Sequence, residues 1–270
     1  MKISLIMATL GRTKEIYNLL DSLVSQTYKN FELIVVDQNE HYEVKNIIDK
    51  FLNKLDIKYI RSNIKGLSIN RNIGLKYCDG DIVAFPDDDC FYSNNVLEEV
   101  YKIFMDKDIK LALIEAIDPV TNEIYISFNL NIIRKNIIKY SLSCNIFLKY
   151  DRNYLFDEKL GVGTYFSSGE ETDYLWQQLS SKDKIIFIKD AYLYHLKGGY
   201  NALTFRKAYK YGLGFGAIFK KDIFLRKNYG NIILFLNYLL RSIGGILISR
   251  NKKMYIGSFF GRIIGFIKYK

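Results

Sequence analysis

The sequence is poor in the residues that define several protein classes. Two prolines among 270 residues exclude a collagen-like chain and a proline-rich disordered one. The cysteines, Cys78, Cys90 and Cys144, are odd in number and form no CxxC pair, which argues against a disulfide scaffold and a structural zinc site. The apolar run at the N-terminus is too short for a signal peptide. We therefore expect a folded protein of one or two domains in a reducing, cytoplasmic compartment.

Glycine-rich phosphate-binding loops are also missing. The turn after the first apolar run reads ATLGRT, with a single glycine, and GxxxxGK[ST] occurs nowhere in the chain. Dinucleotide-binding GxGxxG loops and P-loops need several glycines because their backbone must approach phosphate oxygens closely. These two modes of nucleotide binding are therefore disfavoured.

Acidic residues are nearly absent from the last quarter of the chain. The first 195 residues hold 24 Lys and Arg against 28 Asp and Glu, whereas residues 196–270 hold 15 Lys and Arg and one acid, Asp222. The net charge of +10 therefore arises in a basic C-terminal region attached to a mildly acidic body. Such a region favours a polyanionic partner, which is nucleic acid, an anionic membrane or a phosphorylated ligand.

Short apolar runs alternate with amphipathic helical patterns over the first 120 residues. The pattern predicts strands at residues 3–8, 31–36, 57–60, 81–85 and 111–116, and helices at 44–55, 67–77, 94–104 and from the capping residue Thr13 to residue 24. This alternation is typical of βαβ units, so we expect an α/β fold with a mostly parallel sheet flanked by helices. Ligands of such sheets bind beyond the carboxyl ends of the strands.

The rest of the chain has weaker patterns. Residues 120–165 are irregular, with weak alternation at 124–128, and we expect them to form part of a second-substrate pocket. A helix is predicted at 170–179 and short strands at 185–188 and 192–194. From about residue 201 the pattern is helical to the end, which predicts a helical C-terminal extension.

Three adjacent carboxylates, Asp87, Asp88 and Asp89, follow the predicted strand 81–85. A cation offsets their mutual repulsion, and Mg²⁺ or Mn²⁺ takes oxygen ligands from one or two carboxylates together with substrate phosphates. Residues two apart in an extended chain point to the same side, so Asp87 and Asp89 can bind one ion. The alternative is an acidic, solvated turn.

Two further candidates for ligand binding lie elsewhere in this half of the chain. Asp37 closes the second predicted strand, where a carboxylate accepts hydrogen bonds from a ribose or base in nucleotide-binding folds; capping of a turn is the alternative. Arg71, in the helical segment GLSINRNIG, either meets a base or phosphate or pairs with an acid such as Asp81.

These segments resemble the family 2 glycosyltransferases of bacterial surface-polysaccharide synthesis, which use nucleotide sugars. The resemblance is carried by SLIMATLGRTKEIYNLLDSLVSQTYKNFELIVVDQ and GLSINRNIGLKYCDGDIVAFPDDD, and extends more weakly to SSGEETDYLWQQL and DAYLYHLKG. It implies a GT-A fold, with a divalent metal at the DxD motif and inversion at the anomeric carbon. The implied catalytic domain is residues 1–200, with a nucleotide-sugar half at 1–110 and an acceptor half at 111–200, followed by the C-terminal region 201–270.

The resemblance also assigns contacts to the nucleotide. Thr9, Arg12 and Asp37 fall where the family contacts the nucleoside, and Arg71 falls where it contacts the base or phosphates. Gln38 follows Asp37, at a place where the family often has a second acid. The donor implied by the resemblance is a nucleoside-diphosphate sugar, with a UDP-sugar as the expected one.

A metal site is implied at the acidic triplet. Asp87 and Asp88 resemble donor contacts, and Asp89, with Asp87 beside it, is the expected ligand of Mn²⁺ or Mg²⁺. His195 closes the segment DAYLYH, where the family often has a histidine, and a neutral imidazole is a good ligand for Mn²⁺. The alternative for His195 is a packed or hydrogen-bonded side chain.

Sugar transfer also needs a group that takes the proton of the acceptor hydroxyl. The candidates are Glu170, Glu171 and Asp173, in SSGEETDYLW. The family's ED pair resembles Glu170–Glu171, and its second member acts as the base, which points to Glu171. The alternative is helix N-terminal chemistry, since acids in a first turn favour the macrodipole and Ser168 can cap the helix.

The basic C-terminal region contains amphipathic apolar stretches. Residues 228–240 are uncharged, Arg241 ends the run, and a second apolar stretch carries Arg262. Cations beside amphipathic apolar helices favour a segment, residues 228–270, that lies in an anionic membrane surface. The alternatives are a helical subdomain with solvated cations and a pair of spanning helices. Nucleic acid is disfavoured, since no nucleic-acid module is recognisable.

Together these features predict a metal-dependent, inverting glycosyltransferase that passes a sugar to a hydroxyl of a glycan, with a lipid-linked acceptor expected. It would act in capsule or O-antigen synthesis, in the cytoplasm at the inner face of the cell membrane. Three alternatives remain: an inactive nucleotide-sugar-binding protein, a membrane-bound scaffold and a sugar nucleotidyltransferase. The last lacks its expected glycine-rich loop.

Overall fold

The computed structural model describes residues 1–127, 133–197 and 204–270, which fall into two compact units. The first unit comprises residues 1–65, 69–155 and 179–197, and the second comprises 66–68, 156–178 and 198–270. The second unit thus takes in residues 156–178, which the division expected at residue 200 assigned to the catalytic domain. Phe128, which ended the expected strand 124–128, and residues 201–203 of the expected helix lie outside the described residues.

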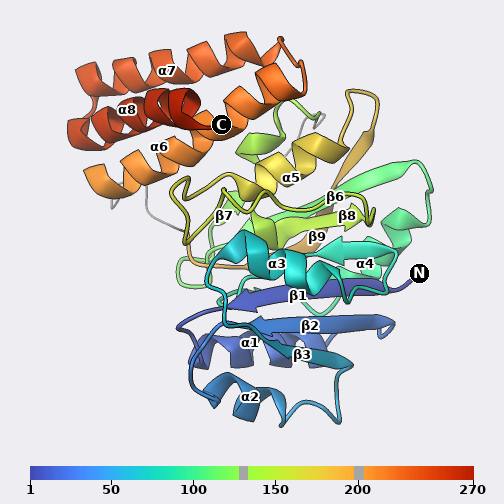
Figure 1. Ribbon diagram of the computed structural model, residues 1–270. Coiled ribbons are helices and arrows are strands. Elements are labelled where there is room, and N and C mark those ends of the chain that lie inside the picture. Colours follow the sequence, from blue (N-terminus) through green and yellow to red (C-terminus); the bar gives the residue numbers. More distant parts are fainter. Residues whose placement is uncertain (128–132, 198–203) are drawn as a thin grey trace. The chain divides into compact units, whose positions relative to one another are not determined.

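Four parallel strands form one half of the sheet of the first unit. They lie in the order β3-β2-β1-β4, of which Figure 1 labels the first three side by side. Their bounds are β1 Ile3–Thr9, β2 Phe31–Asp37, β3 Ile57–Arg61 and β4 Ile82–Ala84. All residues of β2 and all but one of β1 are buried, as continuous apolar runs predict for strands covered on both faces. The expected parallel α/β arrangement is confirmed in this half.

The other half of the sheet is mixed. Strand β8 (Ile146–Lys149) lies antiparallel between β4 and β6 (Ile109–Ile117), and β9 (Lys184–Tyr194) runs parallel to β6. The short strands β5 (Phe91–Tyr92) and β7 (Ile124–Ile126) pair antiparallel with β9 and β6 respectively. The sequence did not predict β5 or β8, and β9 is one strand where two were expected. Asp190 interrupts β9 with φ 63°, and the register of β9 against β6 shifts between Ile114 and Glu115.

Helices cover both faces of the sheet. Helices α1 (Lys14–Val24), α2 (Glu43–Ile48) and α4 (Val96–Phe104) pack in one core cluster with Ile3, Leu5 and Met7 of β1. Helix α3 (Leu67–Leu75) packs on the opposite face, where a Cβ at Gly74 would overlap Ile6. Short 3₁₀ turns follow at Ile137–Lys139 and Ser143–Asn145.

Two local predictions were wrong in detail. Thr13 occupies the N-cap position of α1, but its side chain makes no capping hydrogen bond. Helix α2 ends at Ile48, because the amides of Lys50, Phe51 and Lys54 bond to carbonyls three residues back, which makes tight turns. Phe51 is nevertheless buried, as the apolar spacing of the predicted helix 44–55 requires.

The second unit is helical. It contains α5 (Glu170–Gln178), α6 (Phe205–Lys220), a π-helical turn at Lys221–Leu225, α7 (Asn231–Ile248) and α8 (Lys252–Lys268). Helices α6 and α8 approach backbone to backbone through glycines: a Cβ at Gly216 would overlap the carbonyl oxygen of Arg262, and one at Gly265 would overlap that of Leu213. The helical C-terminal extension is confirmed over the described residues, and Figure 1 shows its helices in orange and red.

Candidate active site

The loop after β4 holds Asp88 in the interior of the first unit. Its carboxylate accepts a hydrogen bond of 2.7 Å from the Thr9 hydroxyl, at the end of β1, and one of 2.6 Å from Arg12. Burial raises the pKa of the Asp88 carboxyl above its ordinary value, although the bonds from Thr9 and Arg12 oppose that shift. A second nitrogen of Arg12 lies 2.9 Å from Asp89, so this cation holds two of the three acids.

Asp87 is held from two other elements. A guanidinium nitrogen of Arg71, on α3, lies 3.0 Å from its carboxylate, and the Ser143 hydroxyl donates to it at 3.0 Å. Arg71 is only 1% exposed and lies over the ring of Phe85 at 5.8 Å. A buried guanidinium needs an anionic partner, so Arg71 is fixed close to the triplet. The pairing of Arg71 with an acid is thus present, with Asp87 as a partner, and a contact of Arg71 with a base or phosphate stays a prediction.

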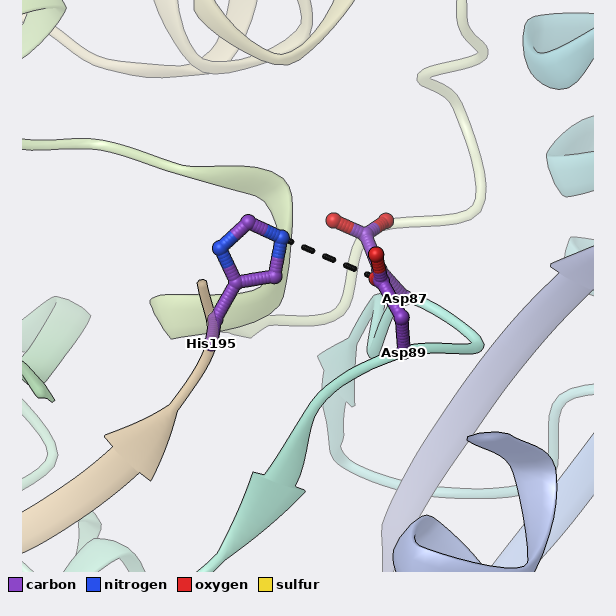
Figure 2. A group of neighbouring side chains, drawn as sticks. All are labelled: Asp87, Asp89 and His195. Atoms are coloured by element: carbon purple, nitrogen blue, oxygen red, sulfur yellow. Dashed lines mark ion pairs between the residues drawn. The ribbon is translucent and has the colours of Figure 1, made fainter. Parts of the chain in front are cut away.

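Asp87, Asp89 and His195 form a group that could hold a metal ion. One ligand atom from each lies within 4.8 Å of the others, and Figure 2 shows the imidazole of His195, from the end of β9, facing Asp89 at 3.6 Å. The other ring nitrogen of His195 lies 3.2 Å from the Tyr125 hydroxyl, a contact of the kind that orients a metal-binding imidazole. Two carboxylates and one imidazole are a donor set that suits Mn²⁺, so these residues fit the expected metal.

Asp37 lies at the end of β2 with no exposed surface. One carboxylate oxygen accepts from the backbone and side-chain nitrogens of Asn39, and the other accepts from the Tyr59 hydroxyl at 2.6 Å. Asn39 in turn accepts a bond of 2.7 Å from the backbone N–H of Gly11. Asp37 therefore fixes the turn beyond β2 and, through Asn39, the turn beyond β1. A direct contact between Asp37 and a nucleoside stays a prediction.

The three candidate bases lie in the second unit, in the first turn of α5, and their environments differ. Glu170 is buried, with its side chain against Gly161, and Glu171 is half-buried. Asp173 has no exposed surface, and its carboxylate accepts from Lys221 at 2.7 Å and from Arg226 at 2.6 Å.

Two side chains near α5 contact α6. The Ser168 hydroxyl donates to the carbonyl oxygen of Tyr211, and capping of α5 by its oxygen stays a prediction. Trp176 is buried against Phe219, as a core residue.

Helix α7, also in the second unit, carries an apolar face that the protein leaves open. Judged by length and composition alone, α7 is the one helix of the described residues that is long and apolar enough to cross a membrane. Only 22% of it is buried inside the protein. Apart from Ile248 at its end, the exposed apolar side chains of α7 fall within an arc of about 100°, at 3.6 residues per turn. They are the outer face of α7: Ile232, Ile233, Leu236, Leu240, Ile243 and Leu247.

The inward face of α7 packs on α8. Arg262 donates to the Tyr238 carbonyl and the Ser242 hydroxyl, both at 2.6 Å. Phe235 is buried and stacks on Phe266 at 4.7 Å.

The structure thus brings most sequence-predicted donor residues of the first unit into one connected cluster. Asp37 is linked to the turn beside it through Asn39. Sequence reasoning missed Ser143 and Tyr125, which lie in the irregular region 120–165 and contact Asp87 and His195. A hydroxyl in an irregular segment carries no local signal, so the sequence could not single them out. The connected cluster consists of Thr9, Arg12, Arg71, Asp87, Asp88, Asp89 and His195.

The family model "Glycosyl transferase family 2" matches residues 4–161, which is more than half of the chain. The chain belongs to glycosyl transferase family 2. The resemblance read from the sequence motifs is therefore confirmed, and residues 4–161 contain Thr9, Arg12, Asp37, Arg71 and the acidic triplet.

Relatives with established names match about a third of the chain. One is the poly(ribitol-phosphate) beta-N-acetylglucosaminyltransferase TarP of Staphylococcus aureus, 32% identical over 104 residues, covering 37% of this chain and 32% of TarP. Another is the UDP-Glc:alpha-D-GlcNAc-diphosphoundecaprenol beta-1,3-glucosyltransferase WfaP of Escherichia coli, 33% identical over 90 residues, covering 33% of this chain and 36% of WfaP. The matched segment spans about a third of the length of each relative.

Solved structures of similar fold cover nearly the whole chain. S. aureus TarS 1–349 in complex with UDP-GlcNAc superposes with a TM-score of 0.72 at 21% identity, covering 98% of this chain and 81% of that one. The mannosyltransferase PcManGT from Pyrobaculum calidifontis, in complex with GDP-Man and Mn²⁺, gives a TM-score of 0.61 at 15% identity, covering 82% and 64%. The expected GT-A fold is confirmed.

Proposed function

We propose that the protein is a glycosyltransferase that moves a sugar from a UDP-sugar to a hydroxyl group of a glycan. The observation that carries this proposal is the cluster at the carboxyl ends of β1 and β4, where two arginines and a histidine surround three adjacent carboxylates. That edge of an α/β sheet is where ligands bind. Membership of family 2 and the solved complexes of TarS with UDP-GlcNAc support a nucleotide-sugar donor.

The residues of the first unit would bind and orient the donor diphosphate. Asp89 and Asp87, with His195, would hold Mn²⁺ or Mg²⁺, and Thr9, Arg12, Asp37, Asp88 and Arg71 would contact or position the nucleotide. The bound metal supplies positive charge to the leaving diphosphate. Arg71, fixed by burial against Asp87, provides a preorganised positive charge for phosphate oxygens, since its guanidinium needs no reorientation.

Glu171 would act as the general base of an inverting displacement. The acceptor oxygen attacks the anomeric carbon as its proton passes to the Glu171 carboxylate, and the bond from that carbon to the diphosphate oxygen breaks on the opposite side. Glu171 suits this role better than its neighbours, since Glu170 is buried and Asp173 is engaged by two cations. The general base of such a reaction contributes about 10²–10⁴-fold.

The acceptor would be a lipid-linked glycan, in synthesis of a bacterial capsule or O-antigen. The name of WfaP specifies a diphosphoundecaprenol-linked acceptor, which supports this class. We place the enzyme in the cytoplasm, at the inner face of the cell membrane, because a peripheral enzyme there meets both a soluble donor and a lipid-linked acceptor. No nucleic acid partner is proposed.

The outer face of α7 would lie in that membrane surface. Arg241 lies on the same helix, about 80° from the edge of this arc, and residues 223–270 contain no acid. An apolar stripe beside cations matches an interface of acyl chains and anionic headgroups. We favour a helix lying flat over a spanning one. Its 18 residues are about 27 Å long, short of a hydrocarbon core of about 30 Å, and Arg262 of α8 binds its inward face.

A thermal-shift screen of nucleotide sugars with Mn²⁺ or Mg²⁺, followed by transfer assays with lipid-linked acceptors, tests this function. We expect one donor to raise the melting temperature in a metal-dependent way and to be consumed with transfer of its sugar. Binding without transfer to any acceptor extract would favour an inactive nucleotide-sugar-binding protein. Formation of a nucleotide sugar from a nucleoside triphosphate and a sugar phosphate would favour a nucleotidyltransferase. Failure of every donor to bind would refute the proposal.

A further inference from the structure

A cluster of buried charges anchors α5 within the second unit. The ammonium group of Lys221 lies between two carboxylates, 2.6 Å from Asp157 and 2.7 Å from Asp173. Arg226 donates to the other oxygen of Asp173 at 2.6 Å, and its second nitrogen lies 3.5 Å from Asp222. The side chains of Asp173 and Asp222 have no exposed surface. Because breaking a buried ion pair leaves an uncompensated charge, separating the members of this charge cluster is costly.

The two cations of the charge cluster, Lys221 and Arg226, lie at the two ends of a π-helical turn. Lys221 begins a π-helical turn that ends at Leu225, and Arg226 follows it directly. π-helical turns are rare and occur frequently at functional sites, since they redirect side chains at a cost in hydrogen-bond geometry. Asp222, the one acid of residues 196–270, is bound there by the side-chain amides of Asn228 at 2.9 Å and Asn231 at 2.7 Å. These bonds hold the π-helical turn in place.

Other hydrogen bonds reinforce the charge cluster from the loop before α5. Burial by itself would raise the pKa of Asp157, but hydrogen bonds from Lys221 and Tyr269 outweigh it and hold the pKa below the ordinary value. Tyr269 is nearly the last residue of the chain, so the cluster joins the loop at 157, helix α5, the π-helical turn and the C-terminal end. Its partners are distant in sequence and close in the fold.

We infer that Asp173, Lys221 and Arg226 are positioning residues for Glu171, an inference that rests on the proposed function. Glu171 lies two residues before Asp173, in a first turn that carries three acids. Three carboxylates within four residues repel one another, and the first turn of a helix frays readily, so this turn needs external cations to hold its geometry. Both carboxylate oxygens of Asp173 accept hydrogen bonds from cations, so its role is to hold the first turn of α5 in place. Glu171, in the same turn, takes the proton of the acceptor hydroxyl. A displacement of a base by about 1 Å costs on the order of 10²-fold in rate.

The test compares Asp173→Asn with Asp157→Asn in steady-state transfer assays. Both variants remove one carboxylate from Lys221, but only Asp173 lies on α5. With each variant assayed well below its melting temperature, we expect Asp173→Asn to lower kcat about tenfold or more and to leave KM for the donor within about twofold. The acid limb of the kcat–pH profile should move to lower pH, since the variant removes a negative charge two residues from Glu171 and so favours the ionised form of Glu171. Asp157→Asn should retain kcat within about twofold.

A second pair of variants keeps the inference testable if Asp173→Asn does not fold. Lys221→Met should lose kcat as Asp173→Asn does, and Lys221→Arg should restore it, because the charge is kept. If Asp173→Asn and Asp157→Asn lose melting temperature alike and both keep the wild-type kcat and pH profile, the inference is wrong. Equal kcat for Lys221→Met and Lys221→Arg would also overturn it. An inactive wild-type protein would instead refute the proposed function, so the two failures are distinguishable.

Discussion

The hydroxyl of Thr9 and the carboxylate of Asp88 are joined by a hydrogen bond of 2.7 Å that spans 79 positions of the sequence. The bond exists because β1 and β4 are parallel neighbours, so the chain leaves both strands at the same edge of the sheet. It places a buried carboxylate at the centre of the donor cluster, between two candidate metal ligands in the chain. The acidic triplet is therefore held partly by the fold itself, before any ligand binds.

Replacing Thr9 by valine should destabilise the first unit. The variant keeps the shape of the side chain but removes the hydroxyl, leaving the buried carboxylate of Asp88 with one donor fewer. We expect the free energy of unfolding in urea to fall by about 1–3 kcal/mol. Thr13→Val is the matched control, because the Thr13 side chain makes no capping hydrogen bond, and it should change stability by less than about 0.5 kcal/mol. Equal losses for the two variants would contradict this prediction.

Replacing His195 by alanine should change the choice of metal. If the imidazole completes the site with Asp87 and Asp89, its loss lowers the affinity for Mn²⁺ more than the affinity for Mg²⁺, since Mg²⁺ prefers oxygen ligands. We expect the Mn²⁺ concentration that gives half of the UDP-dependent thermal shift to rise about tenfold or more, with a smaller change for Mg²⁺. His41→Ala, the other histidine of the chain, serves as the control. Unchanged metal curves for His195→Ala would exclude it as a ligand.

The substitution Glu171→Gln should separate donor binding from transfer. The amide keeps the size of the side chain but takes up no proton, so kcat should fall by about 10²–10⁴-fold while the donor-dependent thermal shift stays. Glu15→Gln makes the same change in the first turn of α1 and should leave transfer unaltered. Undiminished turnover in Glu171→Gln would move the base to Glu170 or Asp173.

An acid placed in the apolar arc of α7 should release the protein from membranes. Leu240→Asp puts a charge among the exposed apolar side chains, whereas Asn237→Asp puts the same charge on the same helix outside the arc. In co-sedimentation with vesicles containing phosphatidylglycerol, we expect Leu240→Asp to lose binding about tenfold more than Asn237→Asp. Equal losses would mean that net charge alone drives binding, and no binding by the wild type would remove the membrane proposal.

The stability of the first unit should depend on pH through Glu32. Burial would raise the pKa of this carboxyl, but hydrogen bonds from Ser4, the amide of Asp79, Lys58 and Lys2 outweigh it and lower the pKa from 4.5 to about 2. A folded pKa below the unfolded one stabilises the protein above the unfolded pKa, and the contribution is lost as pH falls from about 4.5 towards 2.

Glu32→Gln measures this contribution. The gap in unfolding free energy between the wild type and the variant should be on the order of 2–3 kcal/mol near pH 7 and shrink below pH about 4.5. Glu123→Gln, which breaks an exposed ion pair with Lys197, should cost less than about 1 kcal/mol at any pH. A gap for Glu32→Gln that does not change with pH would contradict the prediction.

The parallel half of the sheet was predictable because its signals are local. Buried runs such as residues 3–8 and 31–36 carry the strand pattern themselves, and Asp37 and the triplet follow such runs directly. The insertion of β8 between β4 and β6 was not predictable. Its four residues have no distinctive pattern, and their place depends on antiparallel pairing with strands far away in the sequence. For β9, the polar pair Lys189–Asp190 breaks the apolar run where the register shifts, so one strand read as two.

The site was predictable to the same extent. Carboxylates and arginines in ordered motifs pointed to the donor cluster, and the triplet's partners Thr9 and Arg12 were among them. Two further partners, Ser143 in a 3₁₀ turn and Tyr125 in β7, depend on tertiary packing that no spacing encodes. Nor could spacing show that Asp173 is engaged by Lys221, because the two side chains are 48 positions apart.

The shared unit of α5 and the C-terminal helices changes where the chain can be cut and recombined. A chimera joined at residue 200 would pair the Asp173 carboxylate of one protein with the C-terminal helices of another, and it would leave that carboxylate buried without Lys221 and Arg226. Exchanges that move residues 156–178 together with 198–270 would carry the charges as a complete set. In descent as in engineering, α5 and the basic helices should therefore be inherited together.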